Sequence, residues 1–236
     1  MVKKLKKKMV VVFDLDETLY SEESFITQGL SAAAALLAQE LSMSQREVFK
    51  DLLCLYRQNR FSIFDRFLKE KKCFSAARVL RARAAYRSIT PDLCLFPEAK
   101  KLLSALKNKA SVYVVTDGNV AVQEKKIKAL ELLSFCKKCI ATHRFGKKHA
   151  KPSPYCFLKI CEYEKVAPSS VVYIADDPTK DFLGIKPLGF HTVRVKKGRF
   201  AHAKPDAFHE AECVVESLNS ITLPFLEKQL FEKENQ

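Results

Sequence analysis

The amino-acid sequence predicts an α/β fold, in which a Rossmann-like parallel sheet has an all-helical domain inserted after its first strand. Two observations carry this prediction. From residue 92 onward, short apolar runs rich in β-branched residues alternate with helical patterns, which is typical of a parallel sheet covered by helices on both faces. Before that region lies a stretch of helical periodicity that contains a single glycine, Gly29. We therefore expect a core of residues 1–20 and 92–236, and a helical domain of residues 21–91.

The first strand is predicted at Val10–Phe13. All four of its residues are apolar and three are β-branched, a composition typical of a strand buried on both faces. The inserted domain follows, with apolar residues at helical spacing such as Leu30, Ala33 and Leu37. This periodicity predicts about four helices in the insertion.

The region after Pro91 and Pro97 alternates between strand and helix patterns. Its apolar runs are short and β-branched, and its helical patterns are longer, so each segment can be assigned to one type. The predicted order is helix Glu98–Lys107, strand Ser111–Val115, helix Val120–Leu132, strand Lys138–Ala141, helix Pro154–Tyr163, strand Val171–Ala175, helix Pro178–Leu188, strands His191–Val195 and Cys213–Val215, and helix Ser217–Phe231.

The chain is strongly basic, with a formal net charge of +14. Basic residues gather in the N-terminal run between Lys3 and Lys8 and in the segment Arg60–Arg87. A positive field attracts phosphate esters, and equally nucleic acids and anionic surfaces. A solvated helix face and a lysine-rich tail are the plainer interpretation of these residues.

We expect neither a transmembrane nor a signal segment in this sequence. No apolar run approaches the ~20 residues of a membrane-spanning helix, and the apolar run after the N-terminal lysines stops at Asp14. We expect a cytoplasmic protein whose eight cysteines are small buried side chains rather than disulfides. Cys136 and Cys139 form half of a zinc motif, but His143 and His149 follow too closely for the usual spacing, so ordinary thiols are expected.

Two carboxylates directly follow the first predicted strand. Asp14 and Asp16 lie two residues apart, so their side chains point the same way while the chain stays extended. Ligands of parallel sheets bind outside the carboxyl ends of the strands. Paired carboxylates are unfavourable there without a cation, and Mg²⁺ prefers oxygen ligands. The pair therefore indicates a magnesium site, although a single aspartate here would be only a turn residue.

Two further segments offer groups that bind anions. Thr116–Asn119 follows a predicted strand and presents a hydroxyl and backbone N–H groups at a helix N-terminus, although a simple helix cap is the alternative. Lys151 precedes another helix, and Pro152 and Pro154 stiffen the backbone beside it. A lysine held in this way presents its ammonium group at a nearly fixed place.

A third group of carboxylates follows the strand that ends at Ala175. Asp176, Asp177 and Asp181 lie within six residues, which repeats the argument for a metal site. An acidic helix start alone would explain Asp176 or Asp177, but hardly all three.

In chain order these segments resemble the motifs of the haloacid dehalogenase-like (HAD) superfamily. The resemblance covers essentially the whole core and implies a Rossmann-like sheet, with the helical insertion as a C1 cap. Ala175 stands where a glycine is commoner, and Asp177 where many relatives have an amide or a small residue. Either Asp176 or Asp177 could therefore be the direct metal ligand. The matching residues are Asp14-x-Asp16-x-Thr18, Thr116, Lys151, and Asp176 with Asp181.

The resemblance implies a magnesium-dependent phosphomonoester hydrolase. Asp14 would attack phosphorus and become an aspartyl-phosphate. Asp16 would protonate the leaving alcohol and then activate water; this second aspartate favours phosphate ester chemistry over dehalogenation. The implied phosphate-binding residues are Thr116, Asp117, Gly118 and Lys151. The implied Mg²⁺ ligands are Asp14, Asp16 through its carbonyl and Asp176, with Asp177 and Asp181 as supporting or alternative ligands.

The expected substrate is a small phosphorylated metabolite, either a sugar phosphate or a nucleoside monophosphate, because the motifs are similar to those of sugar-phosphate-phosphatase-like and nucleotidase-like enzymes. Two alternatives are compatible with the same residues. One is a phosphotransfer mutase, which would pass the phosphoryl group to an acceptor. The other is a non-catalytic protein that binds nucleic acid or an anionic surface through its basic residues. The sequence has no signal for oligomeric state.

Overall fold

The computed structural model describes residues 9–231 of the chain. These residues form two compact units. Glu22–Leu93 make up a helical unit, and the segments on either side, up to Ser21 and from Cys94 onward, together make up the other, the core unit. The lysines of the N-terminal run lie outside the described residues.

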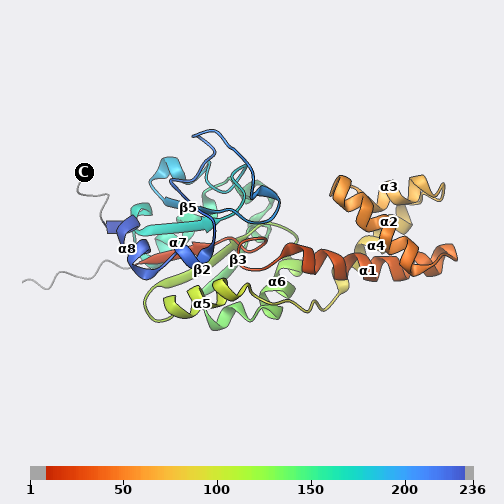
Figure 1. Ribbon diagram of the computed structural model, residues 1–236, viewed down its shortest axis with the longest axis horizontal. Coiled ribbons are helices and arrows are strands. Elements are labelled where there is room, and N and C mark those ends of the chain that lie inside the picture. Colours follow the sequence, from red (N-terminus) through yellow and green to blue (C-terminus); the bar gives the residue numbers. More distant parts are fainter. Residues whose placement is uncertain (1–8, 232–236) are drawn as a thin grey trace, which may run out of the picture. The chain divides into compact units, whose positions relative to one another are not determined.

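Among residues 9–231, the core unit contains one parallel sheet in the strand order β3-β2-β1-β4-β5-β6 (Figure 1). The predicted α/β class and all six predicted strands are confirmed. The strands are β1 (Val10–Phe13), β2 (Ser111–Thr116), β3 (Lys138–Ala141), β4 (Val171–Ala175), β5 (His191–Val195) and β6 (Cys213–Val215).

Strand β1 is central because it pairs with β2 on one side and β4 on the other. Val10 lies beside Ser111 and Val171, and every residue of the three strands is buried. The backbone N–H of Asp14 continues the ladder by donating to the carbonyl of Ile174 at 2.9 Å. The first residue after β1 is thus held at the same sheet edge as the residues that follow β2 and β4.

Helices of the core unit pack against this sheet. The face that includes Val10, Val12 and Tyr113 is covered by α7 through Phe157 and Ile160. Contacts also join α5 to β2, α6 to β3 and α8 to β4. The helices are α5 (Pro97–Leu106), α6 (Val120–Ala129), α7 (Tyr155–Glu164) and α8 (Leu223–Phe231).

The predicted helix Pro178–Leu188 is wrong. The segment consists of turns followed by a short 3-10 helix, Lys186–Leu188. Close packing against the Lys151 loop explains the irregular backbone: a Cβ atom on Gly184 would lie 1.6 Å from the carbonyl oxygen of Pro152. A regular helix of ordinary side chains has no room at this contact.

The helical unit has a hydrophobic core of its own. Leu30, Ala33 and Leu37 pack with Leu52 and Phe67 of neighbouring helices. Gln28 ties the two ends of the unit together, because its side chain accepts from the backbone N–H of Asp92 at 2.8 Å and donates to the carbonyl of the same residue at 2.7 Å. The four helices, in red to yellow in Figure 1, are α1 (Glu22–Leu41), α2 (Gln45–Gln58), α3 (Ile63–Glu70) and α4 (Ala76–Ser88).

Within the described part of the chain, no helix is both long and apolar enough to cross a membrane.

Candidate active site

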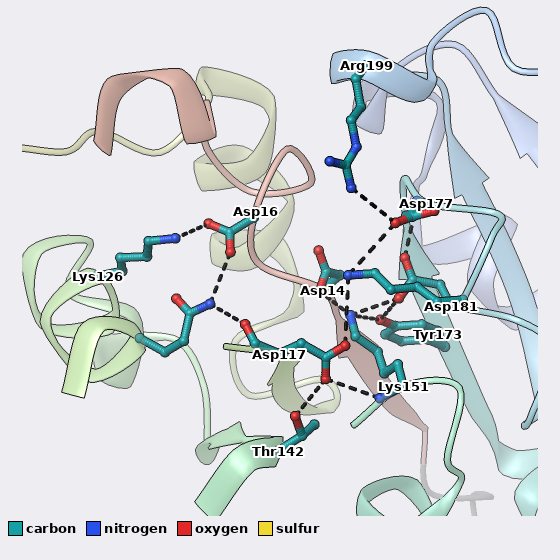
Figure 2. Close-up of polar contacts among 12 residues, drawn as sticks. Asp14, Asp16, Asp117, Lys126, Thr142, Lys151, Tyr173, Asp177, Asp181 and Arg199 are labelled. Atoms are coloured by element: carbon teal, nitrogen blue, oxygen red, sulfur yellow. Dashed lines mark hydrogen bonds and ion pairs between the residues drawn. The ribbon is translucent and has the colours of Figure 1, made fainter. Parts of the chain in front are cut away.

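The carboxyl ends of β1, β2 and β4 bring the predicted motifs together at one sheet edge. Asp14 is the first residue after β1, Thr116 is the last residue of β2, and Asp176 is the first after β4. All three are buried. Lys151 reaches the same place from the loop before α7 (Figure 2). Residues that are far apart in the sequence therefore share one polar site.

Lys151 is the cation at the centre of this site. Its Nζ donates to Asp14 Oδ1, lies 2.8 Å from Asp181 Oδ1 and donates to Tyr173 Oη at 3.0 Å. The side chain is 1% exposed. Burial opposes its charge, but Asp14 and Asp181 outweigh this effect and raise the pKa of Lys151 well above its usual value. The lysine therefore stays charged beside the expected nucleophile.

Tyr173 and Asp181 hold Lys151 from the far side. Tyr173, on β4, accepts from Lys151 and donates to Asp181 Oδ1 at 2.9 Å. The other carboxylate oxygen of Asp181 accepts from the backbone N–H of Asp177 at 3.1 Å. Each polar group has a defined partner, so the ammonium group has little freedom to move.

Three carboxylates form a group suited to a cation. One oxygen from each of Asp14, Asp176 and Asp181 lies within 4.8 Å of the others. Burial raises the pKa of Asp14 to about 7, against the opposing effect of Lys151. Burial and then the neighbouring carboxylates Asp14 and Asp181 raise the pKa of Asp176 to about 9. Buried carboxylates that repel one another fit a hard divalent cation with oxygen ligands, as Mg²⁺ is.

Asp177 is outside this carboxylate group and has other partners. Its Oδ1 accepts from the backbone N–H of Thr179 at 3.0 Å and from the hydroxyl of Thr179 at 2.6 Å. Its Oδ2 lies 3.4 Å from Arg199 and 3.8 Å from Lys180. Of the two adjacent aspartates, Asp176 is the one that faces Asp14 and Asp181 across a distance that a metal could bridge.

The Asp16 side chain points towards α6 rather than into the carboxylate group (Figure 2). Its Oδ1 accepts from Lys126 at 2.6 Å and from Tyr20, and its Oδ2 accepts from Gln123 at 3.1 Å. Burial opposes the charge on Asp16, but Lys126, Tyr20 and Gln123 together lower its pKa below the usual value. Only the backbone carbonyl of Asp16 was expected to bind metal, so this orientation leaves that expectation open.

Asp117 and Gly118 shape the loop after β2. The Oδ1 of Asp117 accepts from the hydroxyl of Thr142 at 2.6 Å and from the backbone N–H of Lys151 at 3.1 Å, so the side chain braces the Lys151 loop. Gly118 has a φ of +131°, and a Cβ there would lie 2.9 Å from the Gln123 amide nitrogen. Asn119 caps α6 by accepting from the Val122 N–H at 3.2 Å.

Several residues of the site were not predicted from the sequence. All have a polar or charged end, and all except the exposed Arg199 are buried or half-buried. The only sequence signals were a tyrosine inside an apolar strand and two polar residues, Gln123 and Lys126, spaced to share one helix face. The missed residues are Tyr20, Gln123, Lys126, Thr142, Tyr173, Lys180 and Arg199.

The eight cysteines are free thiols, but the expectation that all are buried is wrong, because Cys54 and Cys94 are exposed and only Cys136, Cys156 and Cys161 are buried. Cys136 and Cys139 are close enough to interact, and the hydrogen bond between them together with burial raises the pKa of Cys136. Within the described residues, three possible metal ligands come together in one place, at Asp14, Asp176 and Asp181. The cysteine pair is not part of such a group among these residues.

A family model described as haloacid dehalogenase-like hydrolase matches residues 8–189. Glyceraldehyde 3-phosphate phosphatase from Pyrococcus furiosus is 27% identical over 227 residues, which cover 93% of both chains.

Solved structures agree in fold. The HAD phosphatase from Thermococcus onnurineus is 24% identical, with a TM-score of 0.62, and the match covers 94% of this chain and 98% of that one. The HAD hydrolase YfnB from Bacillus subtilis, solved with bound magnesium, is 19% identical with a TM-score of 0.64, covering 91% and 97%. At these identities the structures establish the shared architecture, while the site itself rests on the geometry described above.

Proposed function

The chain belongs to the haloacid dehalogenase-like hydrolase family, and from that premise we propose that it is a magnesium-dependent phosphatase of small phosphorylated metabolites. The observation that carries the proposal is the arrangement around Asp14. Its buried carboxylate is in contact with the Lys151 ammonium and shares a site with Asp176 and Asp181. A carboxylate held beside a fixed cation at a strand end is well placed to attack phosphorus.

The reaction has two displacements at phosphorus. In the first, a carboxylate oxygen of Asp14 forms a bond to phosphorus while the bond to the leaving oxygen breaks. Asp16 donates a proton to that oxygen, a step that requires Asp16 to be protonated when substrate is bound, although its partners in the free site favour the charged form. In the second, Asp16 takes a proton from water, the water oxygen attacks phosphorus, and the bond to Asp14 breaks to release phosphate. Both carboxylates return to their starting states.

Phosphate binding in this proposal falls to groups around the nucleophile. Lys151 and Thr116, with backbone N–H groups near Asp117 and Gly118, contact the transferring oxygens. The charge of Lys151 stabilises the negative charge on these oxygens. Asp117 supports this role because its side chain accepts from the backbone N–H of Lys151.

The proposed cofactor is Mg²⁺, held by Asp14, Asp176 and the carbonyl of Asp16, with Asp181 beside them. When bound, the ion supplies positive charge that lowers the repulsion between the nucleophile and the phosphate. Support comes from the close approach of the three carboxylates and from the relative YfnB, which was solved with magnesium. Asp177, which contacts Thr179 and Arg199, acts in this proposal from outside the metal ligands.

We propose a three-carbon or slightly larger sugar phosphate as the substrate, because the P. furiosus relative is named for glyceraldehyde 3-phosphate and is similar over nearly the whole chain. Nucleoside monophosphates belong in the same test. The helical unit is proposed to be a C1 cap, and the cytoplasm, where such metabolites occur, is the proposed location.

The test is phosphate release from a panel of phosphomonoesters by wild type and Asp14→Asn, with Mg²⁺ or with EDTA. We expect turnover that needs Mg²⁺ and that falls by at least about 10³-fold in Asp14→Asn. Asp206→Asn, at an exposed aspartate next to His209, is the matched control and should match wild type. Turnover that survives in Asp14→Asn would refute the mechanism, and release only after an acceptor is added would indicate a mutase.

A further inference from the structure

A lysine and a glutamine on α6 lie inside the core unit, although their neighbours face solvent. Lys126 and Gln123 are each 3% exposed, whereas Glu124 and Lys128 on the same helix are exposed. The two residues are three positions apart and therefore lie on one helix face. A buried ammonium group is unfavourable unless it is paired, so its partner indicates why it is there.

That partner is Asp16, the proposed acid and base. Lys126 donates to Oδ1 at 2.6 Å, and Gln123 donates to Oδ2 at 3.1 Å. Tyr20 also donates to Oδ1, and the Gln123 amide donates to the carbonyl of Asp117. Two of the three donors come from α6 and together contact both oxygens, so this helix contributes most of the contacts that orient the Asp16 carboxyl group (Figure 2).

The two buried lysines of the site contact different aspartates. Lys151 contacts Asp14, the proposed nucleophile, and Lys126 contacts Asp16. Lys151 lies in the loop before α7 and Lys126 lies within α6, so the two ammonium groups reach the site from different elements. A loss of Lys126 should therefore disturb proton transfer and leave the attack by Asp14 largely intact.

We propose that Lys126 and Gln123 are positioning residues that orient Asp16 for proton transfer to the leaving group. This inference rests on the proposed phosphatase function. The effect of misplacing Asp16 on the rate of cleavage depends on the leaving group. An alkoxide needs a proton as it departs, whereas p-nitrophenolate is stable without one. Misplacing Asp16 should therefore slow the cleavage of alkyl phosphates far more than that of an aryl phosphate.

The experiment compares two substrates in each variant. We measure kcat/KM, which covers the steps up to departure of the leaving group, for glyceraldehyde 3-phosphate and for p-nitrophenyl phosphate. In Lys126→Met we expect about a 10²-fold fall with the alkyl phosphate and less than about a threefold fall with the aryl phosphate. Lys128→Met, at an exposed lysine on the same helix, is the matched control and should leave both values unchanged.

A second variant keeps the test valid if Lys126→Met does not fold, which circular dichroism will report. Gln123→Met replaces a neutral group by one of similar size and should cause the same leaving-group dependence at about tenfold. Lys126→Arg, which keeps the charge, should restore much of the alkyl phosphatase activity. Equal losses with both substrates, or no loss, would overturn the positioning role. If wild type cleaves neither ester, the proposed function fails instead.

Discussion

At the scale of single residues, Tyr173 links the lysine of the site to one of its carboxylates. Its hydroxyl accepts from Lys151 at 3.0 Å and donates to Asp181 at 2.9 Å. The ring is fully buried against Phe157 and Phe182. Removing only the hydroxyl would leave this packing in place and free the ammonium group to shift.

We therefore predict that Tyr173→Phe lowers kcat by about tenfold, because one buried hydrogen bond to a charged group contributes roughly 1.5 kcal/mol. Steady-state phosphate release with a saturating phosphomonoester measures the effect. Tyr163→Phe removes a hydroxyl from a tyrosine that is 74% exposed and should leave kcat unchanged. A Tyr173→Phe enzyme with wild-type kcat would mean that Asp14 and Asp181 alone fix Lys151.

The residues that could be predicted from the sequence are those whose position follows from the element before them. Asp14 and Asp176 come directly after apolar strands, so their place at the sheet edge follows from local pattern. Lys126 could not be found in this way. A lysine in a helix normally faces water, and its burial here depends on Asp16, which lies 110 positions away in the sequence. Contacts of that range leave no periodic signal.

At the scale of elements, two helix predictions differ from the structure: the helix predicted after β4 does not form, and the helix predicted over Ser217–Phe231 is a 3-10 helix, Leu218–Ser220, followed by α8. The six strands and the helices α5, α6 and α7 follow from apolar periodicity. The segment Pro178–Leu188 contains Gly184 and Pro187, which disfavour a helix interior, and it packs its backbone against Pro152 at Gly184. Local preference and the contact between two loops both oppose a helix there.

This contact leads to a prediction about stability. Gly184→Ala would place a Cβ 1.6 Å from the Pro152 carbonyl oxygen, so one loop must move. We expect a loss of about 3 kcal/mol or more in the free energy of unfolding, together with lower activity because Lys151 precedes Pro152. Urea unfolding monitored by circular dichroism provides the measurement.

Gly189 provides the comparison for that variant. Nothing lies within 4 Å of a Cβ built on it, but its φ is +85°. Gly189→Ala should therefore lose only the ~1 kcal/mol typical of a left-handed alanine. If both alanine variants lose the same amount, the close approach at Gly184 has no special effect on stability.

At the scale of the whole molecule, the buried carboxylates should make the metal-free protein less stable as the pH rises. Asp14 and Asp176 have pKa values of about 7 and about 9, above the ordinary 3.8. Between pH 4 and pH 9 the folded state therefore keeps protons that the unfolded state has released. Under that condition the free energy of unfolding falls with rising pH.

In EDTA we expect a fall of several kcal/mol between pH 5 and pH 9. One pH unit per shifted group corresponds to about 1.4 kcal/mol, so two independent groups would give about 8 kcal/mol, and their interaction reduces this total. Urea unfolding at a series of pH values measures it. Asp176→Asn should make the slope shallower. Asp206→Asn should not change it, because hydrogen bonds from His209 lower the pKa of Asp206 below this range. A flat profile in wild type would contradict the prediction.

The hydrogen bonds between Gln28 and Asp92 also bear on the order in which the chain assembles. Val10 and Ser111 are neighbours in the sheet, but they are about a hundred residues apart in the chain. During synthesis β1 therefore leaves the ribosome well before its partner strand β2 has been made. If the helices fold first, Gln28 and Asp92 close the insertion. The flexible part of the connection between β1 and β2 then shortens to roughly thirty residues. This lowers the entropic cost of bringing the two strands together by about 1 kcal/mol. The insertion thus helps to assemble the strand that carries Asp14.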